Sequence, residues 1–266
     1  MNKRLLSVLV ISMALLCVAF AGCTSSQATS GDAQGGVEEK TVYSVGIDVP
    51  YPPFSEMDKN GNPIGFDVDS IKWIAENQGF EVKFEVVAWD GIIPALQAGQ
   101  IDMVYSGMTI TDERREKVNF SIPYWTVNQL VVAQPGSGIT LADVKEGKAI
   151  VGTQSGCTAA MWMEENLVDT GMMPKENLKV YPDTPKAVDD LTTGRIDAVM
   201  YDDLSLKDII AGRDVEKIGF IETNEQFGIA VRKDDNELLE KLNAGLTNLM
   251  ADPYWEELKI QYDMVV

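Results

Sequence analysis

The chain has 266 residues, of which 45% are hydrophobic and 24% charged, a composition typical of a globular protein with one large domain or two smaller ones. Its formal net charge is −19, and a surface this acidic repels phosphate backbones, so no nucleic-acid partner is expected. The sequence contains no histidine and only three cysteines. These counts exclude catalytic schemes and metal sites that need histidine, and we expect neither a metal nor a cofactor.

Residues 1–22 have the pattern of a secretory signal, because two basic residues precede an apolar run over 5–21. The run is also about long enough to span a membrane, so an uncleaved anchor is the alternative. Its end, FAGC at residues 20–23, resembles the lipobox of bacterial lipoproteins, with phenylalanine where leucine is usual. The resemblance implies a lipid, palmitate included, on Cys23. We then expect an extracytoplasmic protein anchored at the outer face of the cell membrane or in the periplasm.

Residues 23–40 are small and polar and lack hydrophobic periodicity, which predicts a flexible tether. If the signal is removed and Cys23 is acylated, Cys157 is the remaining cysteine. We therefore expect no intrachain disulfide, despite the oxidising compartment.

From Thr41 onward, short strand-like segments alternate with helical ones. The segments 43–47 and 101–105 are predicted strands, while 71–79 and 92–99 have helical patterns that end at glycine. This alternation predicts α/β structure with largely parallel sheets.

The second half of the chain repeats part of the first. The segment LQAGQIDMV at 96–104 aligns without a gap with LTTGRIDAV at 191–199. Each copy predicts a helix end, a glycine cap and a buried strand. Two similar lobes are therefore favoured, although so short a match can arise by chance.

Two such lobes form a cleft, and open α/β sheets bind ligands at the carboxyl ends of their strands. The loops after the predicted strands carry aromatic rings, hydroxyls, carboxylates and one candidate arginine. The candidate site residues are Asp48, Tyr51, Trp89, Ser106, Gly107, Thr109, Arg114, Gln154, Thr158 and Asp202.

An arginine and a carboxylate in these loops suit a zwitterionic ligand. Arg114 can bind a carboxylate through two parallel hydrogen bonds, and Asp202 can accept from an ammonium group. Arg114 also falls in the first turn of a predicted helix, where a bound anion would offset the unfavourable helix dipole. The alternatives are a solvated Arg114 beside Arg115, an exposed acidic turn at Asp202 and Asp203, and aromatic residues that serve only the core.

The order of motifs over residues 41–262 resembles the family 3 extracellular solute-binding proteins, which are amino-acid receptors of ABC importers. The motifs that carry the resemblance are DVPYPPF from Asp48, GFDVD from Gly65, WDGIIPAL from Trp89, GMTITDER from Gly107, FSIPY from Phe120, QSGCT from Gln154 and GRIDAV from Gly194. The resemblance implies a two-lobed periplasmic-binding-protein-like α/β fold, with Rossmann-like lobes and two crossover segments. Lobe 1 would contain residues 41–130 and 229–266, and lobe 2 residues 132–228.

The same resemblance implies a role for each candidate. Those expected at the ligand α-carboxylate are Arg114, Thr109 and Thr158. Those expected at the α-ammonium are Asp202, Ser106, Gly107 and the Thr109 hydroxyl. Those expected around the ligand side chain are Tyr51, Trp89, Asp48 and Gln154. The ligand would close the lobes of a monomeric receptor, which would then deliver it to a membrane permease.

Asp48 at the far end of the pocket favours a polar or basic amino acid, such as glutamine, arginine or lysine, over an acidic one. Cys157 in a pocket loop leaves a sulfur-containing amino acid such as cystine open. A ligand-sensing receptor is one alternative function. An enzyme on this fold, such as a dehydratase of cyclic acids, is another, but it needs a general acid or base and Glu113 is the one glutamate in the loops. Binding should be nearly independent of pH between about 6 and 8, because no unperturbed group of the site titrates there.

Overall fold

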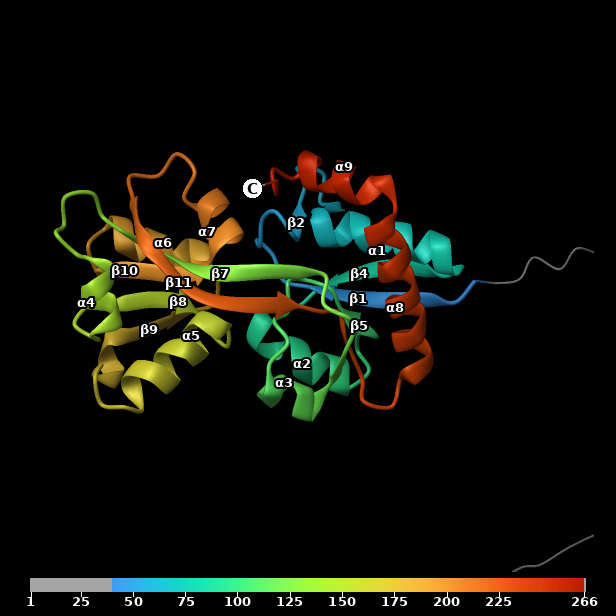
Figure 1. Cartoon of the computed structure of the whole chain (residues 1–266), viewed down its shortest axis with the longest axis horizontal. Coiled ribbons are helices and arrows are strands. Elements are labelled where there is room, and N and C mark those ends of the chain that lie inside the picture. Colours follow the sequence, from blue (N-terminus) through green and yellow to red (C-terminus); the bar gives the residue numbers. More distant parts are fainter. Residues whose placement is uncertain (1–39, 266) are drawn as a thin grey trace, which may run out of the picture. The chain divides into compact units, whose positions relative to one another are not determined.

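Two separate five-stranded sheets organise the computed structural model, which describes residues 40–265 (Figure 1). The predicted signal at 1–22 and Cys23 lie outside the described residues, as does the predicted tether except its last residue. Within 40–265, none of the helices has both the length and the apolar character that crossing a membrane requires.

The first sheet has the strand order β4-β1-β5-β12-β6. Its strands are β1 (Val42–Ile47), β4 (Glu81–Val86), β5 (Met103–Val104), β6 (Asn119–Phe120) and β12 (Ala230–Val231). Strand β1 pairs in parallel with β4 and β5, whereas β12 is antiparallel to β5 and β6. We call this sheet with its helices lobe 1.

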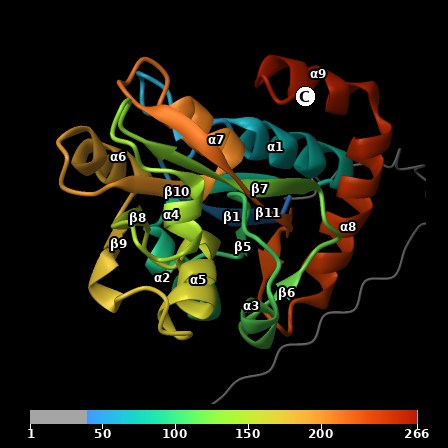
Figure 2. The same cartoon turned by 60° about the vertical axis from the view of Figure 1, so that its left-hand side comes forward.

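Helices cover both faces of the first sheet. They are α1 (Phe66–Gln78), α2 (Trp89–Gln97), α3 (Asp112–Lys117), α8 (Asn236–Ala251) and α9 (Pro253–Gln261). Right-handed crossovers that run outward through α1 and back through α2 place these two helices on opposite faces (Figure 1). Figure 2 shows α8 and α9, in red, beside α1. Gly245 permits this packing, because a Cβ there would lie 2.5 Å from Cγ2 of Ile74.

The second sheet has the order β11-β7-β10-β8-β9. Its strands are β7 (Trp125–Ala133), β8 (Val151–Gln154), β9 (Leu178–Tyr181), β10 (Ala198–Asp202) and β11 (Glu216–Phe227). Strand β8 pairs in parallel with both β9 and β10, just as β1 pairs with β4 and β5. The short repeat in the sequence therefore marks the same helix–strand unit in two lobes. We call the second sheet with its helices lobe 2.

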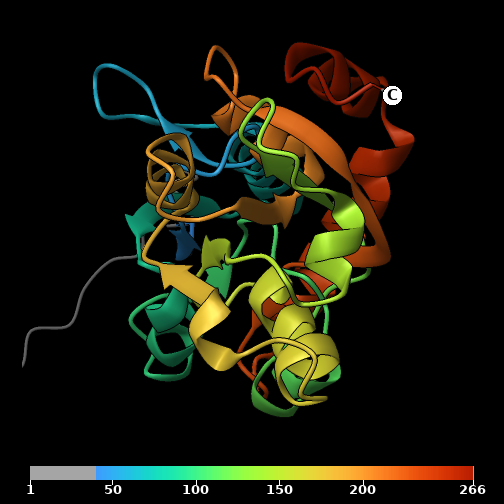
Figure 3. The ribbon, with the colours of Figure 1, turned by 90° about the vertical axis from the view of Figure 1, so that its left-hand side faces the viewer.

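The helices of lobe 2 also lie on both faces of its sheet. They are α4 (Leu141–Lys145), α5 (Thr158–Met163) with the π-helical continuation Glu164–Val168, the 3₁₀ turn Lys175–Asn177, α6 (Thr184–Thr192) and α7 (Asp203–Ile209). Figure 3, which faces this lobe, shows α5 (yellow) and α6 (brown) on opposite sides of the sheet. A small two-stranded ladder, β2 (Glu56–Met57) with β3 (Pro63–Ile64), completes the described elements.

Local sequence signals explain where several elements end. Helix α1 ends at Gly79, which adopts the left-handed conformation with φ 76° as the sequence predicts. Asp183 caps α6 by accepting a hydrogen bond from the backbone N–H of Lys186. Helix α2, predicted from Ile92, begins at Trp89 instead. This earlier start brings Trp89 to the amino end of a helix.

Two segments connect the lobes. The first passes from β6, which ends at Phe120, to β7, which begins at Trp125. The predicted boundary at 130–132 therefore falls inside β7, because the apolar run after Gln129 is a central strand paired with both β10 and β11. The second segment runs from β11 to β12 across residues 228–229.

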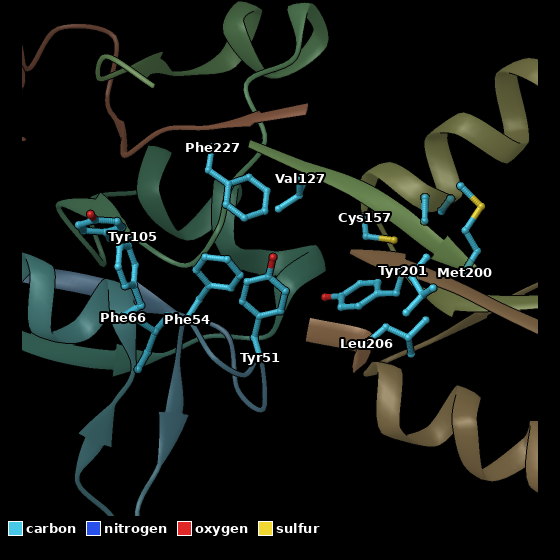
Figure 4. Close-up of a cluster of buried hydrophobic side chains, with 14 of the residues drawn as sticks. Tyr51, Phe54, Phe66, Tyr105, Val127, Cys157, Met200, Tyr201, Leu206 and Phe227 are labelled. Carbon is cyan, nitrogen blue, oxygen red and sulfur yellow. The ribbon is translucent and has the colours of Figure 1, made fainter. Parts of the chain in front are cut away.

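Buried side chains form a cluster that extends through both lobes. Figure 4 shows Tyr51 and Phe54 of lobe 1 on one side of this region and Tyr201 with Cys157 of lobe 2 on the other. The rings of Tyr51 and Tyr201 meet edge to face, with centroids 5.9 Å apart. The carboxyl ends of β1 and β10 thus face each other where the lobes meet.

Candidate functional site

The loop that follows β1 carries Asp48 and Tyr51 into the region between the lobes. Hydrogen bonds fix its backbone: the Asp48 N–H donates to Ser106 Oγ at 3.0 Å, and Ser55 Oγ donates to the Asp48 carbonyl at 2.8 Å. Tyr51 and Ser55 also exchange backbone bonds of 2.9 and 2.8 Å. The loop is consequently ordered before any ligand arrives, which lowers the entropic cost of binding.

Tyr51 rests directly on the backbone of Gly107. The glycine has φ 58°, and a Cβ added there would lie 2.4 Å from a ring carbon of Tyr51. Its N–H donates to Asp67 Oδ2 at 2.7 Å, and the Tyr124 hydroxyl donates to the same oxygen at 2.8 Å. Asp67 is wholly buried, and burial raises the pKa of its carboxyl to about 8. The GFDVD motif contains this residue, but nothing in the sequence pairs it with Gly107 or Tyr124.

Arg114 is buried, whereas its neighbour Arg115 is exposed. Thr111 caps the amino end of helix α3, and its hydroxyl accepts from the Arg114 N–H at 3.1 Å. The guanidinium donates to the Thr109 carbonyl at 2.9 Å and to the Gly156 carbonyl of lobe 2 at 3.1 Å. Burial lowers its pKa from the usual value, and nearby acidic groups act in the opposite direction. The interpretation of Arg114 as a solvated residue is therefore wrong.

Trp89 reinforces the position of the arginine. Its ring centroid lies 5.3 Å from Arg114 Cζ, a cation–π contact, and its indole N–H donates to the Gly156 carbonyl at 3.1 Å. Two side chains of lobe 1 thus bind one carbonyl of lobe 2.

Asp202 ends β10 and is buried, with 6% of its surface exposed. Its Oδ2 accepts from the Tyr51 hydroxyl at 2.7 Å, and its Oδ1 accepts from Gln129 Nε2 at 2.7 Å. Burial, and then repulsion from Glu225, raises the pKa of the Asp202 carboxyl to about 7. An exposed acidic turn is therefore the wrong interpretation of this aspartate.

Asp48 and Gln154 meet at the other end of the site. Gln154 Nε2 donates to Asp48 Oδ2 at 2.6 Å, and the Tyr201 hydroxyl donates to Gln154 Oε1 at 2.5 Å. Burial raises the pKa of Asp48 to about 6, although its bond with Gln154 lowers it. The chain Asp48–Gln154–Tyr201 crosses from lobe 1 to lobe 2.

A small cavity remains among these groups. All predicted site residues except Gln154 line it, together with Cys157 and Tyr201. Its volume is about 10 Å³, room for about one water molecule. Gln154 lies behind the wall, where it holds Asp48 in place. The sequence reasoning missed Tyr201, although it directly precedes Asp202 at the end of the same strand.

In residues 40–265, no cluster of three or more cysteine, aspartate or glutamate side chains has the geometry to hold a metal ion. The cavity instead combines one arginine, carboxylates, hydroxyls and aromatic rings. This set can bind a small molecule that carries both a negative and a positive group.

Residues 43–264 match the bacterial extracellular solute-binding proteins, family 3. The chain belongs to this family. The L-arginine-binding protein of Pseudomonas aeruginosa is 34% identical over 229 residues, which are 82% of this chain and 86% of that relative. An ancestral arginine-binding protein solved with arginine has a TM-score of 0.76 and 35% identity, and the match covers 84% and 98% of the two chains.

A second solved structure bears on the enzyme alternative. It is an ancestral amino-acid-binding protein described as a precursor of cyclohexadienyl dehydratase, with a TM-score of 0.72, 35% identity and a match over 83% of this chain and 95% of the other. These similarities confirm the predicted two-lobed fold of this family 3 solute-binding protein. They also show that its fold lies close to the ancestor of an enzyme.

Proposed function

We propose that this solute-binding protein captures a polar or basic L-amino acid between its lobes and delivers it to the permease of an ABC importer. One observation carries the proposal: Arg114 of lobe 1 and Asp202 of lobe 2 are both buried and both line the same cavity. A free amino acid carries the two complementary charges on a single carbon atom. It would satisfy both groups at once.

In this pose the ligand carboxylate binds the guanidinium of Arg114, whose planar fork matches a carboxylate. Thr158 at the amino end of α5 adds a backbone donor. The ammonium lies against Asp202, with acceptors at Ser106, Gly107 and Thr109 nearby. Tyr51 and Trp89 then enclose the side chain.

The distal end of the cavity supports a polar or basic ligand. Asp48 lies there with Gln154, and Asp183 and Asp90 add to the negative field at its carboxyl. A guanidinium, ammonium or amide group can donate to this carboxylate, whereas an acidic side chain would be repelled. The arginine-bound and arginine-binding relatives agree with this class of ligand.

The closed arrangement of the lobes provides the capture mechanism. Side-chain hydrogen bonds that cross directly between them include those from Tyr51 to Asp202, from Trp89 and Arg114 to Gly156, from Gln154 to Asp48 and from Thr109 to Glu225. A cavity of about 10 Å³ cannot admit an amino acid, so the lobes must separate for entry and close again on the ligand. A ligand that binds both lobes stabilises the closed form over the open one, which is how binding proteins of this kind shift their hinge equilibrium.

Binding without catalysis is part of the proposal. The pocket loops after the strands contain Glu113, and the structure adds Glu225, which borders the site. Both oxygens of Glu225 already accept hydrogen bonds, from Thr109 and Gln129. A general acid needs a proton directed at the reacting group, and these contacts do not provide one. The two cavity carboxyls whose pKa is raised, Asp48 and Asp202, are held by hydrogen bonds from Gln154 and from Tyr51 and Gln129.

Lipid attachment at Cys23 extends the proposal to residues outside the described part of the chain. The FAGC sequence supports it, and a lipid would hold a monomeric receptor at the membrane near its permease. Cys23→Ser should move the protein from the membrane to the soluble fraction. Continued membrane retention of this variant would favour an uncleaved anchor instead.

The most direct test is a thermal-shift screen of the full chain, freed of bound ligand in denaturant and refolded, against the twenty L-amino acids. We expect the melting temperature to rise with arginine, lysine or glutamine, and calorimetry should then give one site per chain. No response to any of the twenty would contradict the proposal.

A further inference from the structure

Glu225 stands at an irregular point of β11, close to where the chain returns to lobe 1. The pairing of β11 with β7 breaks its register between Ile221 and Glu225. Asn224 within this break has φ 51°, and its N–H donates to Asn128 Oδ1 at 3.0 Å. The residue before Glu225 thus has a backbone conformation that is uncommon outside glycine, and a hydrogen bond holds it. We infer that this irregularity of the strand sets the position of the Glu225 carboxylate.

The carboxylate of Glu225 joins the two lobes at the proposed ammonium site. Its Oε2 accepts from the Thr109 hydroxyl of lobe 1 at 2.9 Å. Its Oε1 accepts from Gln129 Nε2 at 2.9 Å, and the same nitrogen donates to Asp202 Oδ1 at 2.7 Å. One amide nitrogen therefore bridges two carboxylates.

The amide of Gln129 makes its side-chain hydrogen bonds through the nitrogen, to Asp202 and Glu225. Its side chain is wholly buried, and its Oε1 has no hydrogen-bond partner among the described residues. Leaving a buried acceptor without a partner costs about 1–3 kcal/mol. The amide nitrogen of Gln129 instead donates to two carboxyl oxygens, which offsets part of this cost.

The contact with Glu225 also fixes what Thr109 can do. A threonine hydroxyl has one proton, and here that proton is donated to Glu225. Only the lone pairs of Thr109 remain for a ligand. The Thr109 hydroxyl can therefore only accept a hydrogen bond from a ligand. An ammonium group can donate to it, whereas an anionic group, which needs a donor, cannot bind it.

We propose that Glu225 is a positioning residue that makes this site specific for a primary ammonium group, by setting Thr109 as an acceptor and, through Gln129, orienting Asp202. This inference rests on the proposed function and deepens it. Glu225 does not need to touch the ligand. Its negative charge also disfavours ligands that lack a cation at this end.

The test compares ligands with and without the ammonium group. L-arginine and 5-guanidinopentanoate, which is arginine without its amino group, are titrated into the full chain by competition calorimetry. L-glutamine and its counterpart without the amino group, glutaramate, form a second pair. Wild type, Glu225→Gln and the control Glu222→Gln, an exposed glutamate of the same strand, are compared.

In Glu225→Gln, we expect the affinity for the amino acid to fall about tenfold or more, as for loss of a charge-assisted hydrogen bond. Affinity for the deaminated ligand should change by less than about twofold on that same scale. Glu222→Gln should bind all four compounds like wild type. Equal losses for both members of a pair, or no loss for either, would overturn the inference.

Thr109→Val provides a second variant that does not depend on how Glu225→Gln folds. It should lose affinity for the amino acid but not for its deaminated counterpart. The double variant with Thr109→Val and Glu225→Gln should lose little more affinity than either single variant, because both changes remove the same hydrogen bond. Full additivity would contradict the inference. Failure of wild type to bind any of the twenty L-amino acids is a distinct result, which would overturn the proposed function itself.

Discussion

The phenol of Tyr51 donates a hydrogen bond of 2.7 Å to Oδ2 of Asp202, across the boundary between the two lobes. The tyrosine follows β1 and the aspartate ends β10, so equivalent ends of the two sheets are joined directly. An arriving ammonium group must share or replace this bond. The protonation of Asp202 therefore matters for both closure and ligand affinity.

Ligand affinity should rise with pH, contrary to the flat dependence that unperturbed groups predict. The pKa of Asp202 is raised to about 7 and that of Asp48 to about 6, and a protonated carboxyl cannot pair with an ammonium. Binding then requires loss of the Asp202 proton, so affinity at pH 6 should be about tenfold lower than at pH 8. Calorimetry in buffers of different ionisation enthalpy should detect proton release on binding at pH 6. Equal affinities at the two pH values would show that Asp202 is already charged.

Stability of the ligand-free protein should fall as pH rises, and Asp67 should be a main cause. Its pKa is raised to about 8 in the fold, against about 4 in an unfolded chain, so the folded state holds the proton between these values. Asp67 should thus lower the free energy of unfolding by about 1.4 kcal/mol per pH unit in this window. Above pH 8 the stabilisation by its bound proton is fully lost. Denaturant unfolding at pH 5, 6.5 and 8 measures the slope.

Asp67→Asn should make the decline of stability with pH shallower, because an amide oxygen can still accept from Gly107 and Tyr124 without becoming charged. The raised pKa values of Asp48 and Asp202 leave part of the decline in place. The excess stability of the variant over wild type should be greatest at pH 8 and smallest at pH 5. Glu76→Gln, an exposed change on the same helix, is the control and should keep the wild-type slope. An unchanged slope in Asp67→Asn would mean that this carboxyl is ionised throughout.

Gly107→Ala should reduce ligand affinity as well as stability. The new methyl group would lie 2.4 Å from the Tyr51 ring, and alanine is strained at φ 58°. Gly99→Ala is a matched control, because that glycine has φ 72° but nothing within 4 Å of its Cβ position. The control should lose about 1 kcal/mol of stability and no affinity. Gly107→Ala should bind at least tenfold more weakly, since Tyr51 must move. Equal behaviour of the two variants would remove the proposed role of the Tyr51 contact.

Local patterns predicted most of the fold because they are local in origin. The repeat LxxGxID reflects a helix end, a glycine with positive φ and a buried strand, all determined within a few residues. The first crossover between the lobes was predicted at 130–132, which lies inside β7, since the apolar run after Gln129 fits any central strand. That run belongs to the second sheet because β7 pairs with β10 and β11, which lie far along the chain.

The site shows the same division between local and distant information. Residues at strand ends, such as Asp48 and Asp202, could be selected because parallel sheets present these positions at one edge. Gln129 and Glu225 lie within the strands β7 and β11 instead. Their proximity to Asp202 results from antiparallel pairing of those strands, and no spacing in the sequence reports it.

Asp48→Asn should change which amino acid is preferred. We expect affinity for L-arginine and L-lysine to fall about tenfold or more, because their distal cation loses a charged acceptor. Affinity for L-glutamine should change less, since an amide can bond to an asparagine. Asp112→Asn, an exposed change at the amino end of α3, should leave the preference unchanged. The same loss for all three ligands would place Asp48 away from the ligand side chain.

Arg114→Lys should separate the geometry of the arginine from its charge. The guanidinium spans the Thr109 and Gly156 carbonyls at 2.9 and 3.1 Å while it lies against the Trp89 ring, and a lysine ammonium cannot reproduce that planar fork. Losing it should weaken amino-acid binding by roughly 2–5 kcal/mol, although the charge is kept. Arg115→Lys, the same change at the exposed neighbour, should leave affinity unaltered. Calorimetry with L-arginine, together with a thermal melt to check folding, measures both. If Arg114→Lys binds like wild type, the carboxylate is recognised by charge alone or elsewhere in the cavity.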